Sequence, residues 1–210
     1  MPDVIKNWAL ENNVVITTKQ LAQLARHKAM VLETNKYMNL TAITDPAEFE
    51  IKHIIDSLTL LPYIPEGVTL GDIGTGAGFP GLVLAIMRED IHVTLVDSLR
   101  KRVLFLQKVI DELGLTNAKA VHSRAENLDE DFDICTARAV ARMDKLAKWV
   151  LPITKRGGTF LAMKGPDVAE ELESAKPILQ KFGGCVKDVH VVEIAAGLFH
   201  SVVMVARCLK

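Results

Sequence analysis

Short apolar runs alternate with amphipathic segments through the middle of the chain. Five runs of strand length lie at residues 68–73, 91–97, 118–122, 132–138 and 158–164. The segments that separate or follow them carry apolar residues at helical spacing, at 82–87, 100–113, 143–150 and 168–182. Strands that alternate with helices predict a parallel sheet with helices on its faces.

The two ends of the chain have other patterns. Two further strands, at 186–194 and 200–207, flank a short connection containing Gly197, which predicts an antiparallel hairpin. Residues 1–65 look helical, with a capping box at Thr17 and a helix start at Asp45. We therefore predict an α/β fold: a seven-stranded, mostly parallel sheet with a C-terminal antiparallel hairpin (66–210), and an N-terminal helical extension packed on it (1–65).

The connection after the first predicted strand is rich in glycine. Gly74, Gly76 and Gly78 permit a positive φ and let a ligand approach the backbone closely. The helix that follows offers unpaired N–H groups and the positive end of its dipole. A strand, a glycine turn and a helix in this order suit a nucleotide-like ligand.

Two cofactors compete for this turn. Residues 76–81 have the spacing G-x-G-x-x-G, and Asp97 follows at about the distance of the dinucleotide fingerprint. Asp72, however, places a carboxylate beside the turn that would repel a pyrophosphate, and Pro80 removes one helix-start donor. The sulfonium, ammonium and ribose of S-adenosylmethionine suit carboxylates. We therefore expect S-adenosylmethionine, with NAD and a turn without a ligand as alternatives.

Acidic and small residues stand where the predicted strands end. In an open α/β sheet, ligands lie beyond the carboxyl ends of the strands. Asp97 is placed to accept hydrogen bonds from both ribose hydroxyls, and Ala125 and Glu126 could flank the adenine. An Asp after a strand can also cap the next helix. The expected cofactor contacts on these grounds are Asp72, Gly74, Gly76, Gly78, Asp97, Ser98, Ala125 and Glu126.

Basic side chains are expected beside these acids at the same edge. Arg138 and Lys164 end the fourth and fifth strands in apolar surroundings, which favours a functional role. Residues 100–102 are equally well explained as a solvated helix start. Together the basic residues could form a mouth that holds phosphates: Lys36, Lys52, Arg100, Lys101, Arg102, Arg124, Arg138, Arg142 and Lys164.

Composition excludes several classes of protein. The 210 residues are 49% hydrophobic and carry a net charge of −1, which is ordinary for a globular protein and argues against a broad nucleic-acid surface. We find no membrane-spanning run and no signal peptide, so we expect a cytoplasmic protein. Cys135, Cys185 and Cys208 lack metal-ligand spacing and predict reduced thiols without a metal site.

A possible hydrolase set lies near the start of the chain. His53, Asp56 and Ser57 fall within about one helical turn. Three such residues on one helix cannot readily align a nucleophile, a base and an orienting carboxylate, and no nucleophile elbow is present. A polar cluster on the substrate side of the site is the better interpretation.

Seven motifs, in order along nearly the whole chain, resemble the bacterial RsmG (GidB) family. The glycine motif alone would indicate only a methyltransferase, whereas the full set is specific. Lys52 and His200 depart from the family pattern, which more often has Arg at both positions. The matching segments are 39–41, 53–58, 72–81, 96–102, 124–126, 137–141 and 163–165.

This resemblance implies a Rossmann-like class I methyltransferase fold and an enzyme that uses S-adenosylmethionine. The family methylates N7 of a guanine in the decoding-region (527) loop of 16S rRNA. The resemblance also implies cofactor contacts at Gly74, Phe79, Ala125, Glu126 and Arg138. We expect RNA contacts at Lys36, Asn39, Lys52, His53, Arg100, Lys101, Arg102, Arg142 and Lys164.

Guanine N7 is a lone pair without a proton, so its methylation needs no general base. We accordingly predict no catalytic acid or base, only positioning by Arg138 and Lys164. The expected partner is 16S rRNA or the small ribosomal subunit, and the expected state is a monomer. A methyltransferase for small molecules, a nicotinamide-dependent reductase and a non-enzymatic RNA-binding module are the rival interpretations.

Overall fold

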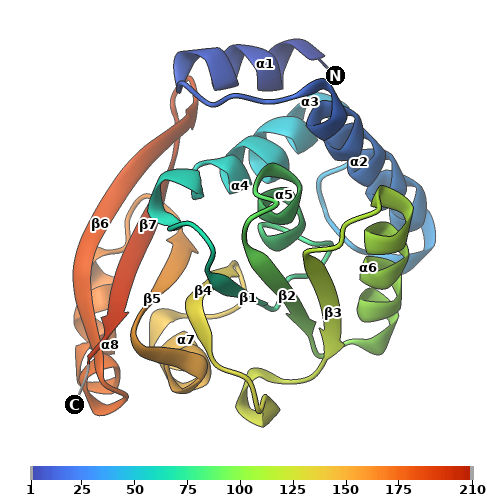
Figure 1. Cartoon of the computed structure of the whole chain (residues 1–210). Coiled ribbons are helices and arrows are strands. Elements are labelled where there is room, and N and C mark those ends of the chain that lie inside the picture. The colour runs from blue at the N-terminus through green and yellow to red at the C-terminus, as the bar shows by residue number, and fades with distance from the viewer. Residues whose placement is uncertain (1, 209–210) are drawn as a thin grey trace.

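The computed structural model describes residues 2–208 and contains one seven-stranded sheet (Figure 1). Its strands are β1 (Thr69–Ile73), β2 (His92–Asp97), β3 (Ala118–His122), β4 (Phe132–Arg138), β5 (Thr154–Lys164), β6 (Gly184–Ala195) and β7 (Leu198–Arg207). The order across the sheet is β3-β2-β1-β4-β5-β7-β6. β3 and β6 therefore form its two edges.

Strand directions follow the predicted pattern. β1 to β5 pair in parallel, whereas β7 pairs antiparallel with both β5 and β6. In the pairing with β5, Lys164 lies opposite Ser201, which brings the beginning of β7 to the carboxyl end of β5. The mostly parallel sheet with a C-terminal antiparallel hairpin is confirmed.

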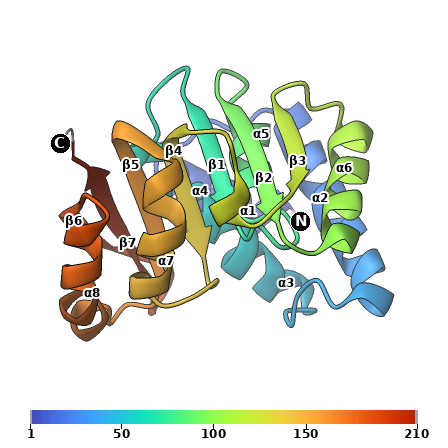
Figure 2. The same ribbon diagram turned by 90° about the horizontal axis from the view of Figure 1, so that it is seen from below.

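Helices cover both faces of the sheet (Figure 2). One face carries α2 (Thr18–Met38), α4 (Asp56–Leu58), α5 (Gly81–Met87) and α6 (Arg100–Leu113), and the other carries α7 (Met143–Val150) and α8 (Ala169–Lys181). Consecutive residues of β4 point to opposite faces, so Ile134 packs in the first apolar cluster and Cys135 in the second. Burial on both faces explains why the strands read as continuous apolar runs.

The N-terminal helices share the first of these clusters. Ile5 of α1 (Pro2–Glu11), Leu24 of α2 and Phe49 of α3 (Pro46–Phe49) are fully buried together with residues of α5 and β2. Thr17 forms the expected capping box with Gln20. The first 65 residues contribute to the same core as the sheet, and the domain boundary at residue 65 stays a prediction.

The segment between α3 and α4 differs from the expected regular helix. Residues Glu50–Ile55 form a π-helical segment, η1, which runs directly into α4. The carbonyl of Lys52 accepts a hydrogen bond from Arg138 of β4, 2.9 Å away. Single π turns often mark functional sites, and this one faces the carboxyl edge of the sheet.

Short 3₁₀ turns complete the fold: η2 (Leu61–Tyr63), η3 (Ala125–Asn127) and η4 (Leu151–Ile153). Helix α2 runs to Met38, and its C-cap residue Asn39 adopts a left-handed conformation. None of the helices among residues 2–208 is both long enough and apolar enough to span a membrane.

Candidate functional site

The glycine turn after β1 has the strained conformation that only glycine adopts easily. Gly74, Gly76 and Gly78 all have positive φ values, of 71°, 60° and 97°. A Cβ on Gly74 would lie 2.7 Å from a methyl carbon of Val140, so any side chain there would collide. Glycine at position 74 therefore lets the backbone of the turn lie closer to Val140 than a residue with a side chain would allow.

Asp72 lies beneath the turn and does not face a ligand. Its carboxylate is fully buried and accepts hydrogen bonds from the N–H of Gly81 (2.8 Å) and the hydroxyl of Thr136 (3.1 Å). Burial raises the pKa of Asp72, although these hydrogen bonds oppose the shift. Both contacts join the turn to the sheet, so Asp72 supports the site from below. The expectation of a carboxylate aimed at a cationic ligand does not match this placement.

One cavity, of about 280 Å³, opens beside the ends of β1 and β2. We call it the Asp97 cavity. Five of the expected cofactor residues contribute to its wall. Its lining is Ile73, Gly74, Val96, Asp97, Ser98, Ser123, Arg124, Ala125, Glu126, Val140 and Trp149.

Asp97 links this cavity to the glycine turn. Its Oδ2 accepts a hydrogen bond from the N–H of Gly76 at 3.1 Å and a longer one from Arg102 at 3.4 Å. Its Oδ1 accepts a hydrogen bond from the N–H of Leu99 at 2.8 Å, immediately before α6 begins. A carboxylate offers about four acceptor positions, so most of its capacity is already used within the protein.

A second cavity, of about 320 Å³, lies on the other side of Gly74, which lines both. We call it the His53 cavity. It lies between the glycine turn, the loop after α2, the π-helical segment and the end of β4. Its lining is Leu40, Thr41, Ile43, Lys52, His53, Asp56, Gly74, Thr75, Gly76, Ala77, Phe79, Arg138 and Ala139.

Stacked rings form one wall of the His53 cavity. Phe79 stacks on His27 and on His53, with ring centroids 4.7 Å apart in each pair. Burial lowers the pKa of His27 to about 4. Burial and the nearby Arg138 cation lower the pKa of His53 to about 3. Both histidines are therefore neutral at physiological pH.

The hydrogen bonds of His53 assign its proton. Nδ1 lies 3.0 Å from the Arg138 guanidinium, which can only donate, so Nδ1 must accept. Nε2 carries the proton and donates to the hydroxyl oxygen of Thr41, 2.8 Å away. Because both ring nitrogens are engaged, His53 is a fixed structural partner and has no free lone pair.

Arg138 is held by three protein groups. Nη1 donates to the carbonyl of Lys52 (2.9 Å) and to Asp56 Oδ2 (2.7 Å), while Nη2 donates to His53. The guanidinium carbon lies 5.4 Å from the centroid of the Phe79 ring, a cation–π distance. Of the five N–H donors of its guanidinium, the Nε–H and one Nη2–H have no partner among residues 2–208 and can bind a ligand.

A third cavity, of about 200 Å³, adjoins the second through Asp56, Arg138 and Ala139. We call it the Lys164 cavity; Met163, Lys164, Gly165 and His200 complete its lining. Lys164 Nζ donates to the carbonyl of Ala141 and to Glu171, each 2.7 Å away. Ala139 has a φ of 54°, rare for a residue with a side chain, and such strain is concentrated at functional sites.

The structure brings together most, but not all, of the expected residues. Gly74, Gly76, Phe79, Asp97, Ser98, Ala125, Glu126 and Arg138 line the Asp97 or His53 cavity. Asp72 and Gly78 line none of the three cavities. A Cβ on Gly78 would lie 2.4 Å from a carbon of Leu82. Gly78 therefore permits close packing of the turn on α5.

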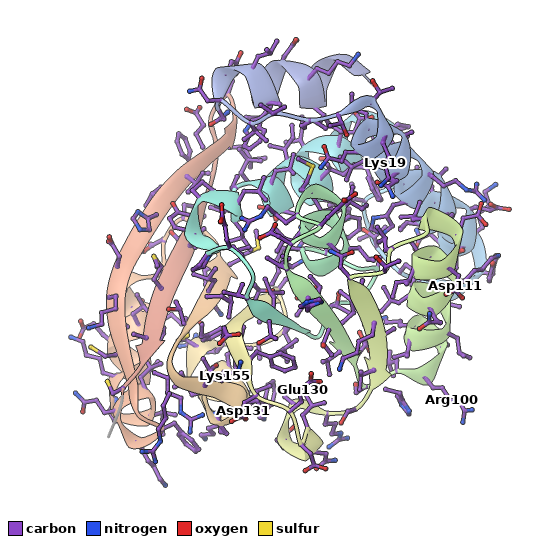
Figure 3. All side chains as sticks on the ribbon, viewed as in Figure 1. Lys19, Arg100, Asp111, Glu130, Asp131 and Lys155 are labelled. Carbon is purple, nitrogen blue, oxygen red and sulfur yellow. The ribbon has the colours of Figure 1, made fainter. Side chains whose placement is uncertain are left out.

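The expected RNA-binding residues fall into two groups. Lys52, His53 and Lys164 line the cavities. The others lie outside them: Lys36 and Asn39 at the end of α2, Arg100, Lys101 and Arg102 on α6, and Arg142 before α7. Figure 3 shows Arg100 at the outer end of α6, pointing away from the sheet. These outer residues could meet only a ligand larger than the cavities.

Several lining residues were not expected from the sequence. Thr41 and Ala139 belong to loops, and Trp149 lies on α7, where its spacing suggests only an ordinary helix position. The sequence did indicate a polar cluster around Asp56, but it did not indicate the partner Arg138, which lies 82 residues away in the chain. Among residues 2–208, no group of His, Cys, Asp or Glu side chains is arranged to hold a metal ion.

Comparison with known proteins supports one family over most of the chain. A family model described as GidB, rRNA small subunit methyltransferase G, matches residues 20–197. The Ribosomal RNA small subunit methyltransferase G of Desulforamulus reducens is 43% identical over 198 residues, covering 90% of this chain and 82% of the relative. The protein of the same name in Clostridium perfringens is 46% identical over 188 residues, covering 85% and 79%.

Solved structures share the fold at low sequence identity. A SAM-dependent methyltransferase from Aquifex aeolicus has a TM-score of 0.58 and 22% identity, covering 77% of this chain and 93% of that chain. A precorrin-6y C5,15-methyltransferase from Geobacter metallireducens has a TM-score of 0.53 and 16% identity, covering 71% and 85%. These similarities confirm a Rossmann-like methyltransferase architecture.

Proposed function

The chain belongs to the family of rRNA small subunit methyltransferases G, and from this premise we propose that it methylates N7 of one guanine in the decoding-region loop of 16S rRNA. It is an enzyme that depends on S-adenosylmethionine, as its family and its fold indicate. The guanine, the atom and the residues that hold each ligand are our proposal.

Two adjoining cavities of unlike chemistry carry this proposal. The Asp97 cavity has a carboxylate beside apolar walls, which suits the ribose and adenine of the cofactor. The His53 cavity continues from it across Gly74 and ends at Arg138, which suits an amino acid carboxylate. S-adenosylmethionine has these groups at its two ends, so the residues present fit the cofactor.

Asp97 would bind the ribose by exchanging one hydrogen bond. Three contacts from Gly76, Leu99 and Arg102 leave about one free acceptor position on its carboxylate. The 3.4 Å contact to Arg102 is the longest of the three and the easiest for a ribose hydroxyl to replace. Asp97 therefore has less free acceptor capacity than the sequence led us to expect when we placed both ribose hydroxyls on it.

Arg138 would hold the carboxylate of the cofactor. Its unused Nε–H and Nη2–H lie in the plane of the guanidinium, and a carboxylate can accept from both. The three protein bonds of Arg138 fix that plane before any ligand arrives. When bound, the cofactor supplies an electrophilic methyl group; the chain supplies its orientation.

The histidines of the site agree with chemistry that needs no base. Guanine N7 is a lone pair without a proton, so attack on a methyl group releases no proton from the nucleophilic atom. His53 is neutral, and its two nitrogens are bonded to Arg138 and Thr41. The protein then contributes alignment of N7 with the methyl group, and such positioning can lower a barrier by about 7–11 kcal/mol.

Outer basic residues would hold the RNA around the reacting base. Lys36, Asn39, Arg100, Lys101 and Arg142 lie outside the cavities, at the ends or beginnings of helices. Lys52 and Lys164 line the cavities into which the base would be turned. Lysine and arginine contacts to phosphate position a nucleic acid without specifying its sequence. We propose that the protein acts as a monomer.

The decisive experiment is transfer of a labelled methyl group from S-adenosylmethionine to unmodified 16S rRNA and to the assembled small subunit. Cleavage chemistry specific for 7-methylguanosine then locates the modified base. We expect one labelled guanine in the decoding-region loop. Binding of the cofactor without label in either RNA would refute the proposed substrate and indicate a small-molecule acceptor instead.

A further inference from the structure

Asp56 is shared between Arg138 and His200. Its Oδ2 accepts a hydrogen bond from Arg138 Nη1 at 2.7 Å, and its Oδ1 lies 2.5 Å from Nδ1 of His200 on β7. The side chains of Arg138, Asp56 and His200 are 16%, 9% and 7% exposed. The Asp56 carboxylate thus connects Arg138 to a histidine that does not line the His53 or Asp97 cavity.

Both ring nitrogens of His200 have a partner. The Asp56 carboxylate can only accept, so Nδ1 carries a proton and donates it to Oδ1. Nε2 lies 3.0 Å from the hydroxyl oxygen of Thr59, which in turn lies 2.6 Å from the carbonyl oxygen of Asp56. These contacts fix the plane of the ring and the direction of its Nδ1–H.

Asp56 keeps the negative charge that this pattern requires. Burial by itself would raise the pKa of Asp56, but the hydrogen bond from His200 and the Arg138 cation lower it below its usual range. Each carboxylate oxygen thus has its own donor, Arg138 at Oδ2 and His200 at Oδ1.

Other groups lie near His200 on the neighbouring strands. β6 places Val192 opposite His200, and its next residue, Glu193, pairs with Phe199. β5 contributes Lys164, a cation whose own hydrogen bonds go to Ala141 and Glu171. Asp56 from α4 is therefore the acidic group bonded to the ring of His200.

We propose that His200 is a positioning residue that acts through Asp56 to hold Arg138 in the geometry that binds the cofactor carboxylate. This inference rests on the proposed role of Arg138 in cofactor binding. The Nδ1–H of His200 fixes one oxygen of Asp56, which leaves the other oxygen directed at Nη1 of Arg138.

Loss of this donor would disturb the connection. Without a partner at Oδ1, the Asp56 carboxylate can turn and move Oδ2 away from Nη1 of Arg138. This movement weakens the bond that orients Arg138. The affinity for the cofactor carboxylate should therefore decrease when residue 200 cannot donate to Asp56.

Position 200 offers its own control. An arginine in place of His200 has several donors, and the Lys164 cavity beside it gives room for the longer side chain. His200→Arg should therefore restore the contact with Asp56. His200→Leu has no donor.

The test measures by calorimetry the affinities for S-adenosylmethionine and for its decarboxylated analogue. We expect His200→Leu to bind S-adenosylmethionine about tenfold more weakly, the loss of one hydrogen bond to a charged group, and to bind the analogue with little change. His200→Arg should bind both ligands like the unchanged protein. His190→Leu, on edge strand β6, is the matched control and should also bind both ligands like the unchanged protein.

The decarboxylated analogue isolates the effect. A general loosening of the cavity weakens the binding of both ligands, and thermal melting checks that all variants are folded. Unchanged affinity of a folded His200→Leu protein, or an equal loss of affinity for both ligands, would overturn the inference. RNA is not needed, so an unmethylated rRNA would contradict only the proposed substrate. Absence of cofactor binding by the unchanged protein would refute the proposed function itself.

Discussion

Replacement of Arg138 by lysine tests the assignment of the cofactor carboxylate most directly. Arg138 makes three hydrogen bonds to Lys52, Asp56 and His53, and two of its N–H groups remain for a ligand. A lysine keeps the positive charge opposite buried Asp56, which limits the damage to the fold. It has three donors on one nitrogen and cannot present two parallel N–H groups to a carboxylate.

The expected magnitude follows from the hydrogen bonds that are lost. A hydrogen bond to a charged group contributes about 1.5–3 kcal/mol, and each 1.4 kcal/mol changes a binding constant about tenfold. If the substituted lysine retains one of the two bonds to the carboxylate, S-adenosylmethionine should bind about 10- to 100-fold more weakly. Alanine at this position is less informative. It leaves Asp56 without its guanidinium partner, and breaking a buried ion pair can cost about 3–5 kcal/mol.

Calorimetry with two ligands separates the carboxylate from other effects. The unchanged protein and Arg138→Lys are each titrated with S-adenosylmethionine and with its decarboxylated analogue, and thermal melting monitors the fold. We expect a large difference between the proteins for the first ligand and little for the second. Arg142→Lys, at an exposed position before α7, is the matched control and should change neither.

Two outcomes would refute this reasoning. A folded Arg138→Lys protein that binds S-adenosylmethionine with unchanged affinity would remove Arg138 from the cofactor. An equal loss of affinity for both ligands would show that Arg138 supports the cavity and does not contact the carboxylate. In the second case an RNA phosphate becomes the expected partner of its free N–H groups.

Three further predictions concern the turn, the ribose and the sheet. Asp97→Asn should raise the dissociation constant for S-adenosylmethionine about tenfold in calorimetry, and an unchanged constant would exclude Asp97 as the ribose partner. Gly81→Ala should lower the free energy of unfolding by about 1–3 kcal/mol in denaturant titration, because its Cβ would lie 2.4 Å from a carbon of Leu95; normal stability would contradict the crowding. Burial by itself would raise the pKa of Asp133, but hydrogen bonds from Thr69 and Lys155 outweigh it and lower the pKa to about 2. The stability that Asp133 contributes should therefore be full above about pH 4 and lost as the pH falls toward about 2; melting temperatures of Asp133→Asn and the unchanged protein that stay equally far apart over this range would contradict it.

The order and type of the elements could be predicted from the sequence because their signals are local. Thr17 caps α2, and Gly114 ends α6 in the left-handed conformation expected of a terminal glycine. Continuous apolar runs predicted buried strands, and two runs around Gly197 predicted the hairpin. These signals act over a few residues, so neighbouring positions in the chain are enough to detect them.

The position of the site along the sheet edge was also predictable in part. The carboxyl ends of parallel strands must meet at one edge, so Asp97, Glu126, Arg138 and Lys164 were expected together. The direction in which a side chain points within that edge depends on its neighbours. Asp72 shows the difference: its place at the end of β1 was foreseen, but its bonds to Gly81 and Thr136 turn it away from the cavities.

The connections between distant segments were decided only by the tertiary structure. Arg138 meets Asp56, which is 82 residues away, and Asp56 meets His200 across 144 residues. No local pattern encodes such contacts, because they depend on the crossover order of the sheet and on the π-helical segment that carries His53. The neutrality of His53 has the same origin, because its protonation state is set by the burial and the Arg138 cation that the fold places against the ring.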